Sequence, residues 1–190
     1  MINILKIYIA LLRGINVGGK NIIKMADLKL MFESIGLYGA QTYIQSGNIL
    51  FKSNEDEQTL RNKIEHEIEK TFGFSISVII RQSVELEGII RNCPFSKESI
   101  LKAESSAEGE TLYVSLLSHE PLKENILRLN TYKSESEEYL MEGRDIYLLF
   151  SNSIRNSKLA SNLHKLEVPT TVRNWKTINK LLLLAKAMEV

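Results

Sequence analysis

The apolar and turn-forming segments of this chain follow one order twice. The run KIYIALL is followed by an amphipathic stretch, the runs TYIQ and NILFKS, a second amphipathic stretch and the run FSISVIIR. Short β-rich runs predict strands, and apolar residues at i, i+3, i+4 and i+7 predict helices. The same order begins again at TLYVSLLS. Two β-α-β-β-α-β units in tandem are typical of ferredoxin-like modules, so we expect an α+β fold with antiparallel sheets.

The boundary between the two predicted modules falls in a polar stretch, residues 97–110. We expect an N-terminal ferredoxin-like module with a Gly-rich loop in residues 1–96, a linker at 97–110 and a C-terminal module in residues 111–190. In the second module we expect one continuous helix over residues 156–166 and a last helix that Asn174 caps.

Composition restricts the environment of the protein. Of its 190 residues 44% are hydrophobic and 25% are charged, and no apolar run approaches the length of a membrane span. The single cysteine, Cys93, excludes an internal disulfide and a zinc site with several thiolates. We therefore expect a cytoplasmic protein that does not enter a membrane, and the sequence predicts no metal and no cofactor.

The charges are unevenly distributed although the net charge is only +1. Residues 1–24 carry four Lys or Arg and no acid, residues 155–190 are also basic, and residues 53–154 are acidic. The acidic part is explained by helices that face water. An alternative interpretation is that the two basic ends supply the positive lining of one anion site.

The segment LLRGINVGGKN has the spacing of a phosphate-binding P-loop, from Gly14 to Gly19 and Lys20. However, Asn21 stands where a P-loop has Ser or Thr, and helical periodicity begins only near Ala26. A P-loop needs its helix to begin at the Gly-Lys pair, because the free N–H groups of the helix then meet the phosphates. The segment is therefore not expected to be an NTPase P-loop.

The loop after the first strand and the turn of the following hairpin are both polar and contain glycine. In a ferredoxin-like sheet these two segments, residues 13–24 and 45–48, meet at one edge, which is our candidate ligand site. We expect its charged groups to neutralise an anion, its glycine N–H groups to form an anion nest and its amides to orient the ligand. Alternatively, the glycines serve a turn and the Asn side chains cap local backbone. The candidate residues are Arg13, Asn16, Gly18, Gly19, Lys20, Asn21, Gln45, Ser46, Asn48 and, from the second half, Arg173.

Two other functions stay open. An RNA-binding protein would use the sheet faces, since Tyr8 and Tyr113 lie in strands that resemble the first strand of an RNA-recognition motif. A protein-interaction module would dock through sheet edges and form an oligomer. The candidate edge contains no Asp, Glu or His, which favours binding over catalysis but leaves open a transferase that acts by positioning and charge.

Three stretches together carry a family resemblance. ALLRGINVGGKNIIKMADLK, QTYIQSGNILFKS and TTVRNWKTINKL closely resemble the bacterial domain-of-unknown-function family numbered 1697. The resemblance covers essentially the whole chain and implies an α+β protein with ferredoxin-like modules, without an established activity. It includes the candidate residues above, together with Gly14, Gly47, Asn174, Trp175 and Thr177. Cys93 departs from the family, in which the similar segment more often reads Asn-Pro-Phe, so a catalytic thiol is not expected as a family property.

Overall fold

The computed structural model describes residues 5–189 and contains two four-stranded antiparallel sheets with helices packed on them. The chain divides into two compact units. The first contains the residues up to Gly88 and those from Lys180 onward, and the second contains Ile89–Asn179. The fold class is therefore α+β, as the sequence predicts.

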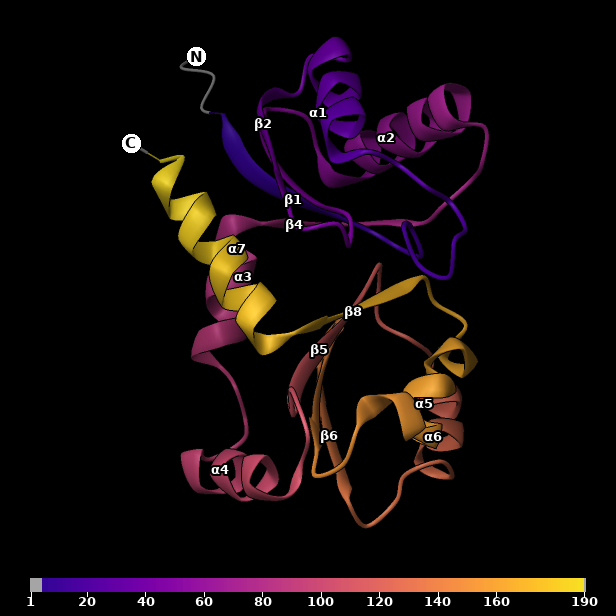
Figure 1. The fold of residues 1–190 in the computed structure, drawn as a ribbon, viewed down its shortest axis with the longest axis vertical. Helices are drawn as coiled ribbons and strands as arrows, with labels where there is room; N and C mark the ends of the chain where they lie inside the picture. Colours follow the sequence, from indigo (N-terminus) through magenta and orange to yellow (C-terminus); the bar gives the residue numbers. More distant parts are fainter. Residues whose placement is uncertain (1–4, 190) are drawn as a thin grey trace. The chain divides into compact units, whose positions relative to one another are not determined.

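The first unit begins with a β-α-β-β-α-β order. Its elements are β1 (Lys6–Leu12), α1 (Met25–Ser34), β2 (Tyr38–Tyr43), β3 (Asn48–Ser53), α2 (Glu57–Phe72) and β4 (Val78–Gln82). The strand order is β2-β3-β1-β4, and every neighbouring pair is antiparallel. α1 and α2 both lie on one face of this sheet (Figure 1).

The core of the first unit follows from the alternation of side chains along β1. Tyr8, Ala10 and Leu12 point to one face, where they join Phe32 of α1 and Ile64 of α2 in a buried cluster. The apolar stripes of the two helices therefore pack on the central strand. This arrangement leaves the loops at the strand ends free to carry a site.

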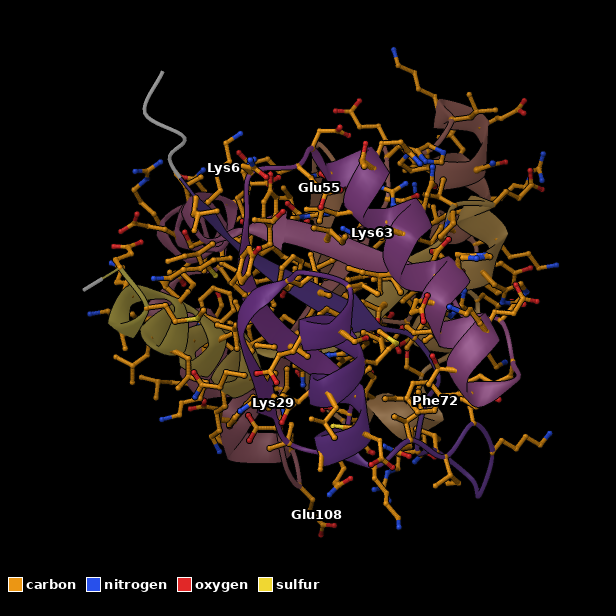
Figure 2. The ribbon with its side chains drawn as sticks, turned by 90° about the horizontal axis from the view of Figure 1, so that it is seen from above. Lys6, Lys29, Glu55, Lys63, Phe72 and Glu108 are labelled. Carbon is orange, nitrogen blue, oxygen red and sulfur yellow. The ribbon has the colours of Figure 1, made fainter. Side chains whose placement is uncertain are left out.

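Local signals fix the ends of α2. Asp56 caps its first turn by accepting a hydrogen bond from the Thr59 N–H at 3.0 Å, and Gly73 ends it in the left-handed conformation. Just before the helix, Glu55 pairs with Lys63, whose Nζ lies 2.8 Å from Glu55 Oε1; both residues are labelled in Figure 2.

The second unit repeats the order with shorter helices. Its elements are α4 (Lys97–Ser106), β5 (Leu112–Leu117), α5 (Lys123–Asn130), β6 (Glu137–Glu142), β7 (Asp145–Phe150), the 3-10 turn η1 (Ile154–Asn156), α6 (Lys158–Ser161), the 3-10 turn η2 (Leu163–Leu166) and β8 (Thr170–Asn174). The strand order is β6-β7-β5-β8, again antiparallel throughout. Two helices, α3 (Ser83–Arg91) and α7 (Trp175–Ala187), cross the division of the chain into units.

The second sheet is covered on both faces. Ile146, Leu148 and Phe150 of β7 point to the cluster that α5, α6 and η2 close, whereas Leu149 points the other way and packs with Ala103 of α4. Accordingly, α4 lies across the sheet from α5 and α6 (Figure 1). Buried side chains on both faces explain why β7 reads as a continuous apolar run.

Two predicted segments differ in the structure. Residues 97–106, predicted as part of a linker, form α4, which Ser96 caps by accepting from the Ser99 N–H at 3.1 Å. The helix predicted over residues 156–166 is broken into η1, α6 and η2, because Ser157 caps a new turn there and accepts from the Ala160 N–H. The predicted module boundaries, 1–96 and 111–190, stay predictions; residues 1–4 and 190 lie outside the described residues.

The helices of the described residues do not meet the requirements of a membrane span. Within residues 5–189 no helix combines the length and the apolar character that crossing a bilayer requires.

Candidate functional site

The two segments predicted to meet at one sheet edge do meet, and Asn16 joins them. Its side-chain Nδ2 donates to the Gln45 carbonyl oxygen and to the Ile23 carbonyl oxygen, both at 2.9 Å. Its Oδ1 accepts from the Ile23 N–H, also at 2.9 Å. One amide thereby ties the hairpin turn to both ends of the loop after β1. We call residues 13–24 together with residues 44–48 the basic edge.

Gly47 brings the hairpin turn close to the end of β1. Its carbonyl oxygen accepts from the Leu12 N–H at 2.8 Å, and its φ is +76°. A β-carbon at this position would lie 2.8 Å from Leu12 Cβ and 2.8 Å from Ile15 Cδ1. Such distances leave no space for a side chain, so the position requires glycine.

The Gly18-Gly19 pair forms the exposed tip of the basic edge. Val17 and Lys20 pair across it as a small β-bridge, in which the Lys20 N–H donates to the Val17 carbonyl oxygen at 3.2 Å. Both glycines have positive φ, as a tight turn of this kind demands. Among the residues that the structure describes, the N–H groups of Gly18 and Gly19 have no acceptor, so they stay open to a ligand.

Several predicted ligand groups hold the scaffold together, and their part in ligand binding stays a prediction. Asn21 Nδ2 donates to the Gly14 carbonyl oxygen at 3.2 Å. Asn48 is buried, and its Nδ2 donates to Tyr43 O at 3.1 Å and to Ser46 Oγ at 2.9 Å. The alternative in which Asn side chains serve local backbone therefore explains these amides, as it does Asn16.

The charged groups of the basic edge are all positive. Arg13, Lys20 and Lys24 are exposed, and none of them has an ion-pair partner within residues 5–189. Lys24 also stands at the start of α1, where no side chain caps the first turn. The free N–H groups of that turn add to the positive potential, while Asp27 in the same turn reduces it.

The geometry is not that of a P-loop. Gly19 and Lys20 belong to the tight turn, and α1 begins only at Met25. The N-terminus of α1 therefore does not follow the Gly-Lys pair, as P-loop chemistry requires.

Arg173 lies in β8 of the second unit and is buried. Its Nη1 donates to Thr171 Oγ1 at 2.7 Å and to the Val172 carbonyl oxygen at 2.9 Å. Burial lowers the pKa of its guanidinium to about 10, so it stays charged at neutral pH. Its predicted part in ligand binding stays a prediction. The next residue, Asn174, accepts from the Thr177 N–H at 2.8 Å and so caps α7, as the sequence predicts.

The tyrosines on which RNA binding would depend point into the cores. Tyr8 is buried, stacks on Phe51 with ring centroids 5.8 Å apart and donates its hydroxyl to the Glu55 carbonyl oxygen at 2.8 Å. Tyr113 packs edge-on against Phe150 in the core of the second unit. Burial raises the pKa of both phenols. Both rings therefore contribute to packing, and RNA binding stays a prediction.

Few described side chains are suited to acid–base catalysis or to metal binding. The three histidines are exposed and lie apart in the chain: His66 in α2, His119 in the loop after β5 and His164 in η2. Within the described residues, no group of three His, Cys, Asp or Glu side chains is placed to hold a metal ion. Cys93 is half-buried, and burial raises the pKa of its thiol, which disfavours the reactive thiolate.

Sequence reasoning missed the apolar part of the basic edge. Val17, Ile22 and Ile44 expose 66%, 60% and 49% of their surface around its cations. Ile44 also adopts a φ of +51°, which is unfavourable for a β-branched residue. The sequence does contain a signal for this surface: Val17, Ile22 and Ile44 are branched apolar residues inside polar turns, where core packing does not require them.

These features define an α+β protein whose first unit presents a rigid basic edge. The chain belongs to the family described as "Protein of unknown function (DUF1697)", whose model matches residues 5–147. It is also similar to the conserved bacterial protein SP0830 from Streptococcus pneumoniae, with 27% sequence identity and a TM-score of 0.71 over 96% of this chain and 99% of that one. No curated protein matches it. The family inferred from the three sequence stretches is thus confirmed.

Proposed function

We propose that the basic edge binds a small anionic ligand that carries a phosphate group. The observation that carries this proposal is the Asn16 side chain, which joins the loop and the hairpin turn into one fixed surface. A surface held in its binding conformation loses little entropy when a ligand arrives.

The groups left free on this surface suit an anion. Arg13 is anchored through its own N–H, which donates to the Ser77 carbonyl oxygen at 3.1 Å, and its guanidinium can form two parallel bonds to a phosphate. Lys20 adds a second charge beside the exposed N–H groups of Gly18 and Gly19. Gln45, whose carbonyl oxygen is used by Asn16, keeps its side-chain amide to orient the ligand.

The remaining candidate residues act by supporting this arrangement. Asn16, Asn21, Ser46 and Asn48 use their polar groups within the edge, so their substitution would weaken binding by loosening the surface. The basic edge has no histidine and no acid between Arg13 and Lys24 or in the turn. Since a general base is missing there, the proposal is one of binding, without a reaction.

Thermal shift of the purified protein tests the proposal. The probe is ATP, compared with adenosine at the same concentration. A ligand at a hundred times its dissociation constant stabilises by about 2.7 kcal/mol, which raises the melting temperature by roughly 5–10 °C for a chain of this size.

Matched variants locate the shift. Arg13→Ala/Lys20→Ala should abolish it, whereas Lys70→Ala/Lys97→Ala, which removes two exposed cations outside the basic edge, should leave it unchanged. An undiminished shift in the first double variant would refute the assignment to this edge.

A second candidate function is favoured by the exposed Val17, Ile22 and Ile44. Apolar side chains between cations are suited to a protein partner with an acidic and partly apolar surface. This candidate predicts that ATP causes no thermal shift. It also predicts loss of partner binding when Val17 and Ile22 are replaced by serine.

We also propose that each half is a ferredoxin-like module and that the chain is a tandem duplication. The support is a common register: Ile9 of β1 pairs with Arg81 of β4, and at the corresponding place Val114 of β5 pairs with Arg173 of β8. In both halves the last strand passes directly into a helix, α3 or α7. A cytoplasmic location belongs to this proposal as well, because one cysteine in 190 residues suits a reducing compartment.

A further inference from the structure

The second unit contains a cavity of about 400 Å³ at one end of the β6–β7 pair. Its two walls are the loop of residues 131–137, which joins α5 to β6, and the segment 150–158, which joins β7 to α6. A volume of this size falls in the range that small-molecule sites occupy, about 300–1,000 Å³. All the residues that line it belong to the second unit, so it is separate in the chain from the basic edge.

Backbone hydrogen bonds fix the first wall. The Ser134 N–H donates to Glu137 Oε2 at 3.0 Å, and the Glu137 N–H donates back to the Ser134 carbonyl oxygen at 3.2 Å. The Ser151 N–H donates to the Ser136 carbonyl oxygen at 2.9 Å and thereby joins the two walls. Glu137 and Phe150, paired across β6 and β7, close the cavity at its base. The cavity is therefore formed before a ligand arrives.

The second wall presents hydroxyl groups in fixed positions. Ser153 Oγ accepts from the Arg155 N–H at 3.3 Å, and Ser157 Oγ accepts from the Ala160 N–H at 2.9 Å. A serine hydroxyl that accepts one bond keeps its own O–H to donate. Both hydroxyls can therefore still donate to a ligand oxygen.

The two lysines and the two asparagines of the lining have no partner among the residues that the structure describes. Lys133 comes from the first wall and Lys158 from the second, and neither forms an ion pair there. Asn152 and Asn156 likewise have no side-chain hydrogen bond. The one carboxylate of the lining, Glu137, already accepts from Ser134. Glu137 keeps its negative charge in this bond, so the two lysines and one carboxylate give the lining a net charge of +1.

We propose that this cavity binds a sugar phosphate. The ammonium groups of Lys133 and Lys158 hold the phosphate from opposite walls. The amides of Asn152 and Asn156 and the serine hydroxyls bind the hydroxyl groups of the sugar, because each of them can donate to or accept from an alcohol.

Calorimetric titration with glucose 6-phosphate tests this inference independently of the basic edge. It is carried out on the full-length Arg13→Ala/Lys20→Ala protein, in which the basic edge has lost two of its three cations. That protein should still bind glucose 6-phosphate, and it should bind glucose at least tenfold more weakly, because hydrogen bonds to charged groups are the strong ones.

Further variants assign the binding to the cavity. Adding Lys133→Met/Lys158→Met should weaken the binding of glucose 6-phosphate about tenfold or more. The control, Lys123→Met/Lys165→Met, replaces two exposed lysines outside the cavity and should leave this affinity unchanged. Circular dichroism checks the fold, and Asn152→Ala/Asn156→Ala serves as a second probe of the same walls. The inference would be overturned if the Arg13→Ala/Lys20→Ala protein no longer bound glucose 6-phosphate. It would also be overturned if neither cavity variant changed the affinity for glucose 6-phosphate.

Discussion

The side-chain amide of Asn16 donates to the main-chain carbonyl oxygen of Gln45 at 2.9 Å, across 29 residues of the chain. The same side chain exchanges two further bonds with Ile23. It therefore holds three points of the first unit together: the loop after β1, the approach to α1 and the hairpin turn between β2 and β3. The cations of the basic edge stand on a surface that this one amide fixes.

Asn16→Gly should destabilise the first unit by about 2–3 kcal/mol, because it removes three hydrogen bonds worth about 1 kcal/mol each. Glycine is the appropriate substitution, since Asn16 has a φ of +54° and alanine would add backbone strain. Asn21→Gly is the matched control: Asn21 has a φ of +49° and donates a single side-chain bond, to Gly14 O. Urea unfolding should show the larger loss for Asn16→Gly, and equal losses would contradict its role as a clamp.

Gly47→Ala should lower the free energy of unfolding clearly more than Gly36→Ala does. Both glycines have similar positive φ, +76° and +80°, so the backbone strain of about 1–2 kcal/mol is common to both variants. Only at Gly47 would the new β-carbon collide, with Leu12 and Ile15 at 2.8 Å, whereas nothing lies within 4 Å at Gly36. The collision should add about 1–3 kcal/mol in thermal or urea unfolding. Equal free energies of unfolding in the two variants would contradict the close approach of the turn to β1.

The cap of α2 should make part of the stability depend on pH. Hydrogen bonds from Thr59 lower the pKa of Asp56 below its usual value. A carboxylate whose pKa is lower in the folded state stabilises above its unfolded pKa, about 3.9, and loses this contribution as the pH falls through the folded pKa. Asp56→Ala should therefore be less stable than the wild type at pH 7, and the difference should narrow below about pH 4. A difference that grows on acidification would contradict this assignment.

Cys93 should react slowly in the folded protein. Burial raises the pKa of its thiol, so the thiolate fraction at pH 8 is smaller than that of an ordinary cysteine, whose pKa is about 8.5. Alkylation by iodoacetamide, followed against pH, should have its midpoint above that value in the native protein. In urea the midpoint should return to the ordinary value. A native midpoint near or below pH 7 would show instead an activated thiol.

Much of the fold could be predicted from the sequence because its signals are local. The stripe that ends at Gly36 and the cap at Asn174 each depend on neighbouring residues, and both lie where the sequence places them. Residues 97–106 were misread because Ile100 and Ala103 give too weak an apolar stripe. That helix is stabilised by its cap at Ser96 and by packing on Leu149.

The site could be predicted only in outline. The topology of the sheet predicts that the loop and the hairpin turn lie together. The side-chain partners of Asn16 and Asn48 could not be predicted, because they are the main-chain carbonyl groups of Gln45 and Tyr43. No local sequence pattern reveals the direction in which these carbonyl groups point. These amides were therefore expected to face a ligand. The cavity in the second unit was not predicted, because its second wall contains η1 and the start of α6, where the sequence was expected to form one helix over residues 156–166.

A ¹⁵N–¹H correlation spectrum of the full chain, titrated with ATP and with inorganic phosphate, tests whether the basic edge binds an anion. An anion site there predicts saturable shifts in the amide signals of Gly18, Gly19 and Gln45, and the absence of these shifts in Arg13→Ala/Lys20→Ala. Saturation of the protein with these three signals unmoved would contradict an anion site on the basic edge.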